Sequence, residues 1–306
     1  MNIAAVIMAA GRSTRMRSAL PKGAHKICGK PMARHIIDTC RGAGADKIIV
    51  VVGHEKEKMM AALGDDVTYV EQKEQKGTGH ACAQAFPELT EDVDTVLVFP
   101  ADTPLVDVKT VKDLIKTHKT EDNSVTLLGA YLSDALSYDR IIRGKGTEIK
   151  AVVESKDADE ETLKIGEFNT SIYAFRRDFL ISSVSKLSTN NAQGEYYLTD
   201  LIGIAHDEEG ERAGLCLMEN ADDAIGVDDR IRLAAATATM RRRINEAIMA
   251  EGVTLIDPAT TYIDCDVKIG RDAVIYPCTV IERGAKIAEN EVVPPFSRIL
   301  GETEKQ

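Results

Sequence analysis

The chain has 306 residues, with 38 basic and 49 acidic side chains and a net charge of −11 at pH 7. An acidic balance argues against general nucleic-acid binding, which needs a basic face. No apolar run is long enough to span a bilayer. The six cysteines form no Cys-x-x-Cys pair, which indicates reduced thiols in a cytoplasmic protein.

Strands and helices alternate along the first half of the chain, and the strands are unbroken runs of valine, isoleucine and leucine. Strands are predicted at 3–8, 47–53, 67–70 and 95–102, and helices at 30–44 and 55–63. This alternation is typical of an α/β fold with a mostly parallel sheet and helices on both faces. Three further strand-like segments, at 124–132, 148–154 and 168–175, are expected to form a smaller extension with a mixed sheet.

A six-residue period follows a long predicted helix at 228–252. Isoleucine recurs at positions 263, 269, 275, 281 and 287. Small or β-branched side chains recur at the same spacing: Val267, Ala273, Thr279 and Ala285. This pattern predicts a left-handed parallel β-helix of about two turns, which is marginal as an independent domain. We therefore expect it to pack on the long helix or on the same segment of another subunit.

The stretch at 8–22, MAAGRSTRMRSALPK, gathers four cations although the protein is acidic. It leaves the carboxyl end of the first predicted strand, where open α/β sheets bind ligands. Gly11 allows close approach of the backbone, and the side chains of Arg15 and Lys22 can surround phosphate oxygens together with nearby amides. The loop lacks the GK[ST] ending of a P-loop and the later glycines of a dinucleotide fingerprint. We interpret Arg17 as a solvated side chain.

The same stretch resembles the G-x-G-T-R-M…P-K signature of sugar-nucleotide pyrophosphorylases. Further blocks resemble, in order, one branch of that family, the bacterial bifunctional UDP-N-acetylglucosamine pyrophosphorylases/glucosamine-1-phosphate acetyltransferases. These blocks are GTGHA (77–81), ADTPLV (101–106), VVE (152–154), EFNTSIYAF (167–175), NNAQGEYYLTD (190–200) and GVDDRIRL (226–233). The resemblance covers essentially the whole chain. It implies a Rossmann-like nucleotidyltransferase domain at 1–227, a linking helix at 228–252 and a truncated hexapeptide-repeat left-handed β-helix at 253–306.

The resemblance also implies a reaction. A phosphate oxygen of a sugar 1-phosphate, with N-acetylglucosamine 1-phosphate as the leading candidate, attacks the α-phosphorus of UTP, and pyrophosphate leaves. The nucleophile is already an anion, so catalysis consists of positioning and charge neutralisation. The implied cofactor is Mg²⁺, which commonly takes its ligands from one or two carboxylates and from substrate phosphates.

Carried over residue by residue, the resemblance assigns four groups of side chains. The nucleotide is held by Met8, Ala9, Ala10, Gly11, Gln72, Gly77, Thr78 and Ala101. The triphosphate and the sugar phosphate are held by the catalytic residues Arg15 and Lys22. The sugar is faced by Asp139, Glu154 and Asn169. The metal is bound by Asp102, which follows a strand, and by Asp228, which is expected to begin a helix after a strand-like segment at 224–227.

Four positions depart from the family pattern. Ser13 and Ala101 replace glycines, Asp228 replaces an asparagine, and Asp139 replaces a glycine that faces the sugar. A carboxylate at position 139 could hydrogen-bond sugar hydroxyls or clash with an acetamido group. The resemblance favours UDP-N-acetylglucosamine as the product, and Asp139 makes UDP-glucose or another UDP-sugar a close rival.

Two further classes of function stay open on the same fold. One is a cytidylyl- or guanylyltransferase. The other is a regulatory or assembly protein without catalysis, against which the presence of Lys22, Asp102 and Asp228 argues. The family's acetyltransferase is built from many solenoid turns and this chain ends at Gln306, so we expect no acetyltransferase activity. Because solenoids of this family form trimers, we expect a homo-oligomer through the β-helix. The six histidines are interpreted as structural or surface residues.

Overall fold

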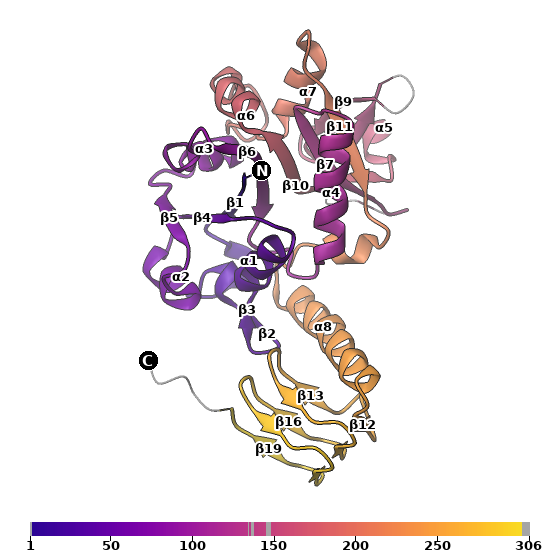
Figure 1. Cartoon of the computed structure of the whole chain (residues 1–306). Helices are drawn as coiled ribbons and strands as arrows, with labels where there is room; N and C mark the ends of the chain where they lie inside the picture. Colours follow the sequence, from indigo (N-terminus) through magenta and orange to yellow (C-terminus); the bar gives the residue numbers. More distant parts are fainter. Residues whose placement is uncertain (1, 134, 136–137, 145–147, 302–306) are drawn as a thin grey trace. The chain divides into compact units, whose positions relative to one another are not determined.

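The computed structural model describes residues 2–133, 135, 138–144 and 148–301. The chain divides into two compact units (Figure 1). The first comprises residues 1–24 and 33–226, and the second comprises residues 25–32 and 227–306. Residues 302–306, at the end of the predicted β-helix segment, lie outside the described residues. No helix in the described ranges is both long and apolar enough to cross a membrane.

A nine-stranded sheet forms the centre of the first unit. Its strand order is β11-β7-β10-β6-β1-β4-β5, with β8 and β9 attached beside this path. The strands are β1 (Asn2–Ala9), β4 (Lys47–Val52), β5 (Thr68–Glu71), β6 (Val93–Pro100), β7 (Val125–Tyr131), β8 (Arg140–Arg143), β9 (Ile149–Val153), β10 (Glu167–Arg176) and β11 (Ala213–Leu217). Strand β1 pairs in parallel with β4 and β6, β4 with β5, and β7 with β11. The mostly parallel sheet predicted from the sequence is confirmed.

The predicted smaller extension is wrong, because its strands belong to the main sheet. Strand β10 lies antiparallel between β6 and β7 and hydrogen-bonds to both. Strand β9 forms a hairpin with β8, in which Val153 pairs with Arg140. An antiparallel strand inserted between two others satisfies the backbone groups of both neighbours. Such an insertion leaves no local signal in the sequence of the inserted strand.

Helices cover both faces of this sheet, because alternate side chains of a strand point to opposite faces. Ala5 and Ile7 of β1 pack in one apolar cluster with α1, α2 and α4. Ala4 and Val6 pack in a second cluster with α3, α6 and α7. The helices are α1 (Met32–Gly42), α2 (Lys56–Leu63), α3 (Thr78–Ala83), α4 (Val108–Thr120), α5 (Glu160–Leu163), α6 (Arg177–Ser183) and α7 (Asp200–Asp207). The unbroken apolar strands of the sequence are thus buried on both sides.

The second unit consists of helix α8 (Arg230–Ala250), a coil of short strands, and a hairpin of β2 (Lys26–Ile27) and β3 (Lys30–Pro31). The short strands are β12 (Thr254–Leu255), β13 (Tyr262–Ile263), β14 (Lys268–Ile269), β15 (Val274–Ile275), β16 (Val280–Ile281), β17 (Lys286–Ile287), β18 (Val292–Val293) and β19 (Arg298–Ile299). They stack in parallel as β12-β15-β18, β13-β16-β19 and β14-β17. Three six-residue repeats therefore make one coil. The described strands form more than the two coils that were predicted.

The six-residue period has two physical causes in this coil. The predicted inward positions are filled by buried side chains such as Ile263, Ile275 and Ala273. The corners also repeat every six residues, and each has a left-handed backbone with φ between 59° and 84°: Asp266, Asp272, Cys278, Gly284, Asn290 and Phe296. Glycine, asparagine and aspartate tolerate that conformation best. The β-helix predicted from the isoleucine spacing is confirmed.

Candidate active site

The loop after β1 carries the predicted phosphate-binding residues, and its backbone is unusual. Ser13 and Arg17 have left-handed φ values of 51° and 47° on either side of a short 3₁₀ turn at Thr14–Met16. The side chain of Met16 is 1 % exposed and anchors this turn in the core. Gly11 has open space where a side chain would begin, so a ligand can reach its backbone. The loop is therefore held in place while its polar atoms stay accessible.

A cavity of about 870 Å³ opens at this loop, beside the carboxyl ends of β1 and β6. It has a size typical of small-molecule sites. Its wall contains the predicted nucleotide and phosphate residues together with one predicted metal ligand: Met8, Ala9, Ala10, Gly11, Arg15, Lys22, Gln72, Gly77, Thr78, Ala101 and Asp102. These residues meet because the carboxyl ends of parallel strands lie at one edge of a sheet.

Lys22 and Asp102 form an ion pair on the cavity wall, through Nζ of the lysine and Oδ2 of the aspartate. Lys22 begins a 3₁₀ turn at Lys22–Ala24, and Asp102 follows the end of β6. Their side chains are 22 % and 14 % exposed. The adjoining backbones are tightly packed, because a Cβ added to Gly23 would lie 3.0 Å from the Cβ of Ala101. Sequence reasoning assigned each charge its own role at one phosphate cluster and did not predict this ion pair.

Another part of the cavity wall is formed around Gly77, at the start of α3. This glycine has φ 106°, and a Cβ there would lie 2.6 Å from the carbonyl oxygen of Tyr196. Only glycine fits at such a position without a shift of the backbone. The hydroxyl of Thr78 accepts a hydrogen bond of 2.9 Å from the amide of Leu198. Gln72, which is 3 % exposed, donates from Nε2 to the carbonyl oxygen of Gly77 at 3.2 Å.

The predicted sugar residues Asp139, Glu154 and Asn169 form a separate group outside the cavity wall. Asp139 accepts hydrogen bonds from the amide of Ser155 at 3.0 Å and from Nδ2 of Asn169 at 3.4 Å. Glu154 accepts a hydrogen bond of 3.1 Å from the hydroxyl of Thr199. The structure thus brings the three predicted residues together and adds Ser155 and Thr199, which sequence reasoning missed.

Two of the proposed sugar-facing residues, Asp139 and Glu154, have neighbouring carboxyl groups. Asp139 and Glu154 hydrogen-bond each other, which requires a proton on one of them. Burial, and after it the charge of Asp139, raises the pKa of Glu154 to about 8. Burial also raises the pKa of Asp139. Two like charges this close cannot both ionise cheaply, so the pair titrates as a unit that holds one proton near neutral pH.

Asp228 belongs to the second unit, and its predicted surroundings are wrong. Residues 225–228 form no strand. The cap of α8 is Asp229, which accepts a hydrogen bond from the amide of Arg232. Asp228 instead forms an ion pair of 3.2 Å with the guanidinium of Arg232. The carboxylate next to it is the better helix cap, and the role of Asp228 in metal binding stays a prediction.

The cavity suits a divalent cation that takes most of its ligands from a substrate. Within the described ranges, no cluster of three or more His, Cys, Asp or Glu side chains could hold a metal. Asp102 supplies a carboxylate on the cavity wall, just after the end of β6. Mg²⁺ usually takes one or two carboxylate ligands from the protein, and phosphates and water complete its coordination shell.

Sequence reasoning missed part of the cavity wall. The additional lining residues are Arg12, Gly23, Lys73, Glu74, Gln75, Ala81, Pro100, Ser171 and Glu195, while Ser13 and Thr14 of the wall were predicted to offer amides to phosphate. Ser171 and Glu195 lie inside the quoted blocks at 167–175 and 190–200, so a signal for them existed. Ser171 also has a left-handed φ of 61°. The run Lys73–Gln75 carried no signal, because it reads as an ordinary charged loop.

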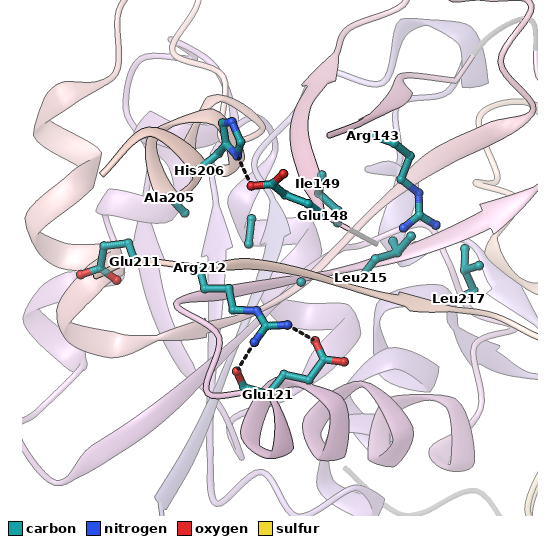
Figure 2. A pocket seen from close by; sticks show the side chains of 12 residues that line it. Glu121, Arg143, Glu148, Ile149, Ala205, His206, Glu211, Arg212, Leu215 and Leu217 are labelled. Atoms are coloured by element: carbon teal, nitrogen blue, oxygen red, sulfur yellow. Dashed lines mark hydrogen bonds and ion pairs between the residues drawn. The ribbon is translucent and has the colours of Figure 1, made fainter. Parts of the chain in front are cut away.

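A second cavity of about 610 Å³ lies beside the edge strand β11 and shares no lining residue with the first (Figure 2). Each of its two arginines, Arg143 and Arg212, pairs with a carboxylate. Arg212 contacts the carboxylate of Glu121 at 3.7 Å, and Nδ1 of His206 lies 3.2 Å from that of Glu148 (Figure 2). Because Arg212 pairs with Glu121 and Arg143 with Glu167, this cavity is less suited to a polyphosphate than the first.

Residues 5–131 match the MobA-like NTP transferase domain family. This match agrees with the parallel sheet and with the cavity at the strand ends. The chain therefore carries a nucleotidyltransferase domain.

The full chain resembles a particular set of curated relatives. It is 45 % identical over 96 % of its length to the bifunctional protein GlmU of Exiguobacterium sp. strain AT1b. It is 42 % identical over 98 % of its length to the bifunctional protein GlmU of Caldanaerobacter subterraneus. The chain spans 65 % of the length of each of these relatives. The family resemblance drawn from the sequence blocks is confirmed.

A solved structure shares the fold. It is the crystal structure of a UDP-glucose pyrophosphorylase complexed with UDP-glucose, with a TM-score of 0.62 and 17 % sequence identity. The match covers 79 % of this chain and 100 % of that one. At this identity the likeness concerns the fold alone.

Proposed function

We propose that the protein transfers a uridylyl group from UTP to a sugar 1-phosphate, giving a UDP-sugar and pyrophosphate, with N-acetylglucosamine 1-phosphate as the leading acceptor. One observation carries the proposal. A single cavity at the strand ends combines an accessible glycine loop, the cations Arg15 and Lys22 and the carboxylate of Asp102 with the buried amide of Gln72. The nucleotidyltransferase domain at 5–131 and the similarity to bifunctional GlmU proteins support it.

The side chains of the cavity divide the work. Gln72, Gly77 and Thr78 hold the nucleoside, while Arg15 and Lys22 donate hydrogen bonds to phosphate oxygens and neutralise their charge. The attacking group is a phosphate oxygen that is already ionised, so none of these residues has to remove a proton. Rate enhancement then comes from orientation and from preorganised charge.

Magnesium fits this scheme as the cofactor, with Asp102 and Asp228 as its proposed protein ligands. When bound, it would withdraw charge from the phosphates and so make the α-phosphorus easier to attack. In the protein without substrate, Lys22 neutralises Asp102 through their ion pair. The lysine therefore has to move towards the phosphates when the carboxylate turns to a metal ion.

A second candidate acceptor is glucose 1-phosphate. The observation that favours it is the carboxylate of Asp139, which stands among the proposed sugar residues and hydrogen-bonds Asn169 and Ser155. Asp139→Gly should raise kcat/KM for N-acetylglucosamine 1-phosphate relative to glucose 1-phosphate, because it removes a bulky charged group. An unchanged ratio would take Asp139 out of the sugar site.

We further propose a cytoplasmic location and self-association through the β-helix. All six cysteines are free, as expected in a reducing compartment. The coil exposes apolar side chains at Tyr262, Val280 and Val292, which are suited to contact another subunit. Sedimentation of Val280→Glu should give a smaller particle than the unmodified protein. Equal masses would count against this surface.

The experiment for the main proposal is pyrophosphate release from UTP and Mg²⁺ with a panel of sugar 1-phosphates. We expect release that depends on the sugar and is fastest with N-acetylglucosamine 1-phosphate. Asp102→Asn should lose about 10²- to 10³-fold in kcat, the usual cost of removing a preorganised charged group. Arg17→Ala, on the same loop but exposed, is the matched control and should be nearly silent. Absence of pyrophosphate release with every sugar would contradict the proposal.

A further inference from the structure

His80 contacts the side-chain amide of Gln72, at the end of the cavity where the nucleobase is proposed to bind. It sits in the first turn of α3, whose position is held by a 2.8 Å hydrogen bond from the amide of Gly79 to the carbonyl of Tyr196. Nδ1 of its ring lies 3.0 Å from Nε2 of Gln72. The side chain of Gln84 contacts the other side of the ring at 3.4 Å and also donates to the His80 carbonyl. The imidazole therefore lies between the side-chain amides of two glutamines.

The orientation of the Gln72 amide follows from its neighbours. The carbonyl oxygen of Gly77, 3.2 Å away, can only accept a hydrogen bond, so the nitrogen of the Gln72 amide must face it. The same nitrogen lies 3.0 Å from Nδ1 of His80, so Nδ1 accepts and the ring proton resides on Nε2. The amide nitrogen of Gln84, at 3.4 Å from Nε2, then faces a second donor and forms no hydrogen bond with the ring. Among the described residues no donor meets Oε1 of Gln72, and Gln72 lines the cavity. The free group at the base end is thus an acceptor.

An acceptor at that place distinguishes the two pyrimidines. Uracil carries a hydrogen on ring nitrogen N3 and can donate it, whereas N3 of cytosine is itself an acceptor. Two acceptors facing each other lose a hydrogen bond and leave both groups desolvated. A site built around a specific hydrogen bond rejects the analogue that lacks the donor. A Gln72 amide that could rotate would lose this discrimination, because its nitrogen could then serve cytosine.

We infer that His80 is a positioning residue that, together with the Gly77 carbonyl, holds the amide oxygen of Gln72 towards the base and so makes the site select UTP over CTP. The inference rests on the proposed function, in that the cavity must bind a nucleotide. It assigns a role in specificity to a histidine that the sequence indicated to be structural. His80 itself touches Gln72 and not the reacting atoms.

The test compares His80→Leu, His80→Asn and Gln84→Leu with the unmodified protein. For each, kcat/KM is measured by pyrophosphate release with UTP, CTP and dTTP, and dissociation constants are measured by calorimetry. His80→Leu should lower the UTP/CTP ratio about tenfold, the usual size of one hydrogen bond at a buried site. Its UTP/dTTP ratio should not change, because thymine has the same N3 hydrogen. His80→Asn offers an acceptor near the place of Nδ1 and should restore the ratio, and Gln84→Leu should retain it.

The outcomes separate this inference from the proposed function. If the unmodified protein binds no UTP, both are wrong. If it binds and turns over UTP while His80→Leu keeps the full UTP/CTP ratio, only the role of His80 is overturned. Should His80→Leu fail to fold, ¹⁵N NMR of the unmodified protein decides. We expect the His80 ring protonated on Nε2 and bare on Nδ1, and the opposite tautomer would overturn the inference.

Discussion

Replacing Lys22 with methionine removes a positive charge from the carboxylate of Asp102 and keeps a side chain of similar length. In the unmodified protein a metal ion can use Asp102 fully only after this ion pair opens. A hydrogen bond to a charged group contributes about 1.5–3 kcal/mol. Both side chains are partly exposed, at 22 % and 14 %, so we take the lower end of that range. At about 1.4 kcal/mol per factor of ten, Lys22→Met should bind a divalent metal about tenfold more tightly without nucleotide.

Turnover should move in the opposite direction. Lys22 also neutralises phosphate charge in the proposed reaction, and loss of such a group typically lowers kcat by about 10²- to 10³-fold. A structural defect alone would lower metal affinity and turnover together. Tighter metal binding together with slower turnover therefore identifies a lysine that competes with metal in the free protein and contacts phosphate in the complex.

The assay is calorimetric titration with Mn²⁺ in the absence of nucleotide, followed by pyrophosphate release with saturating Mg²⁺. Asp102→Asn should abolish the tight phase of the titration, which assigns it to this carboxylate. Arg17→Met is the matched control, because Arg17 lies on the same loop with an exposed side chain, and it should change neither quantity. A folded Lys22→Met variant with unchanged or weaker metal affinity would refute the reasoning.

Three further outcomes follow from single positions. The raised Glu154 pKa, about 8 against an ordinary 4.5, gives stability that is present below pH 4.5 and is lost as pH rises through 8. In urea titrations Asp139→Asn should therefore lose less stability over this range than the unmodified protein, and an equal loss would show that the two carboxyls do not interact. Gly77→Ala places a Cβ 2.6 Å from the Tyr196 carbonyl oxygen and should weaken UTP binding at least about tenfold by calorimetry, so unchanged binding would contradict the assigned wall. Phe296 is 83 % exposed and has a left-handed φ of 60°, a conformation that asparagine tolerates better. Phe296→Asn should therefore stabilise the β-helix by about 1 kcal/mol and slow its hydrogen exchange, and faster exchange would count against this reasoning.

Much of the architecture follows from local chemistry that the sequence displays. Apolar runs such as 3–8 and 47–53 can be buried on both faces only in a sheet covered by helices, which is why the layered fold was predictable. Isoleucine recurs at every sixth position from 263, and this period predicts a coil in which each face contributes one inward-pointing side chain. Gly11 with Arg15 and Lys22 indicated a phosphate loop, because an accessible backbone and cations are what a polyphosphate needs.

The tertiary structure alone decided which side chains face each other. Lys22 and Asp102 are 80 positions apart, and they meet because β1 pairs in parallel with β6 and both strands end at the same edge of the sheet. The proton shared by Asp139 and Glu154 depends on burial and on a neighbouring charge, and neither is a property of local spacing. The sequence determined the period and polarity of each segment, since those depend on neighbours along the chain. The contacts of the site depend on strand order and on what each side chain is buried against, which only the folded chain contains.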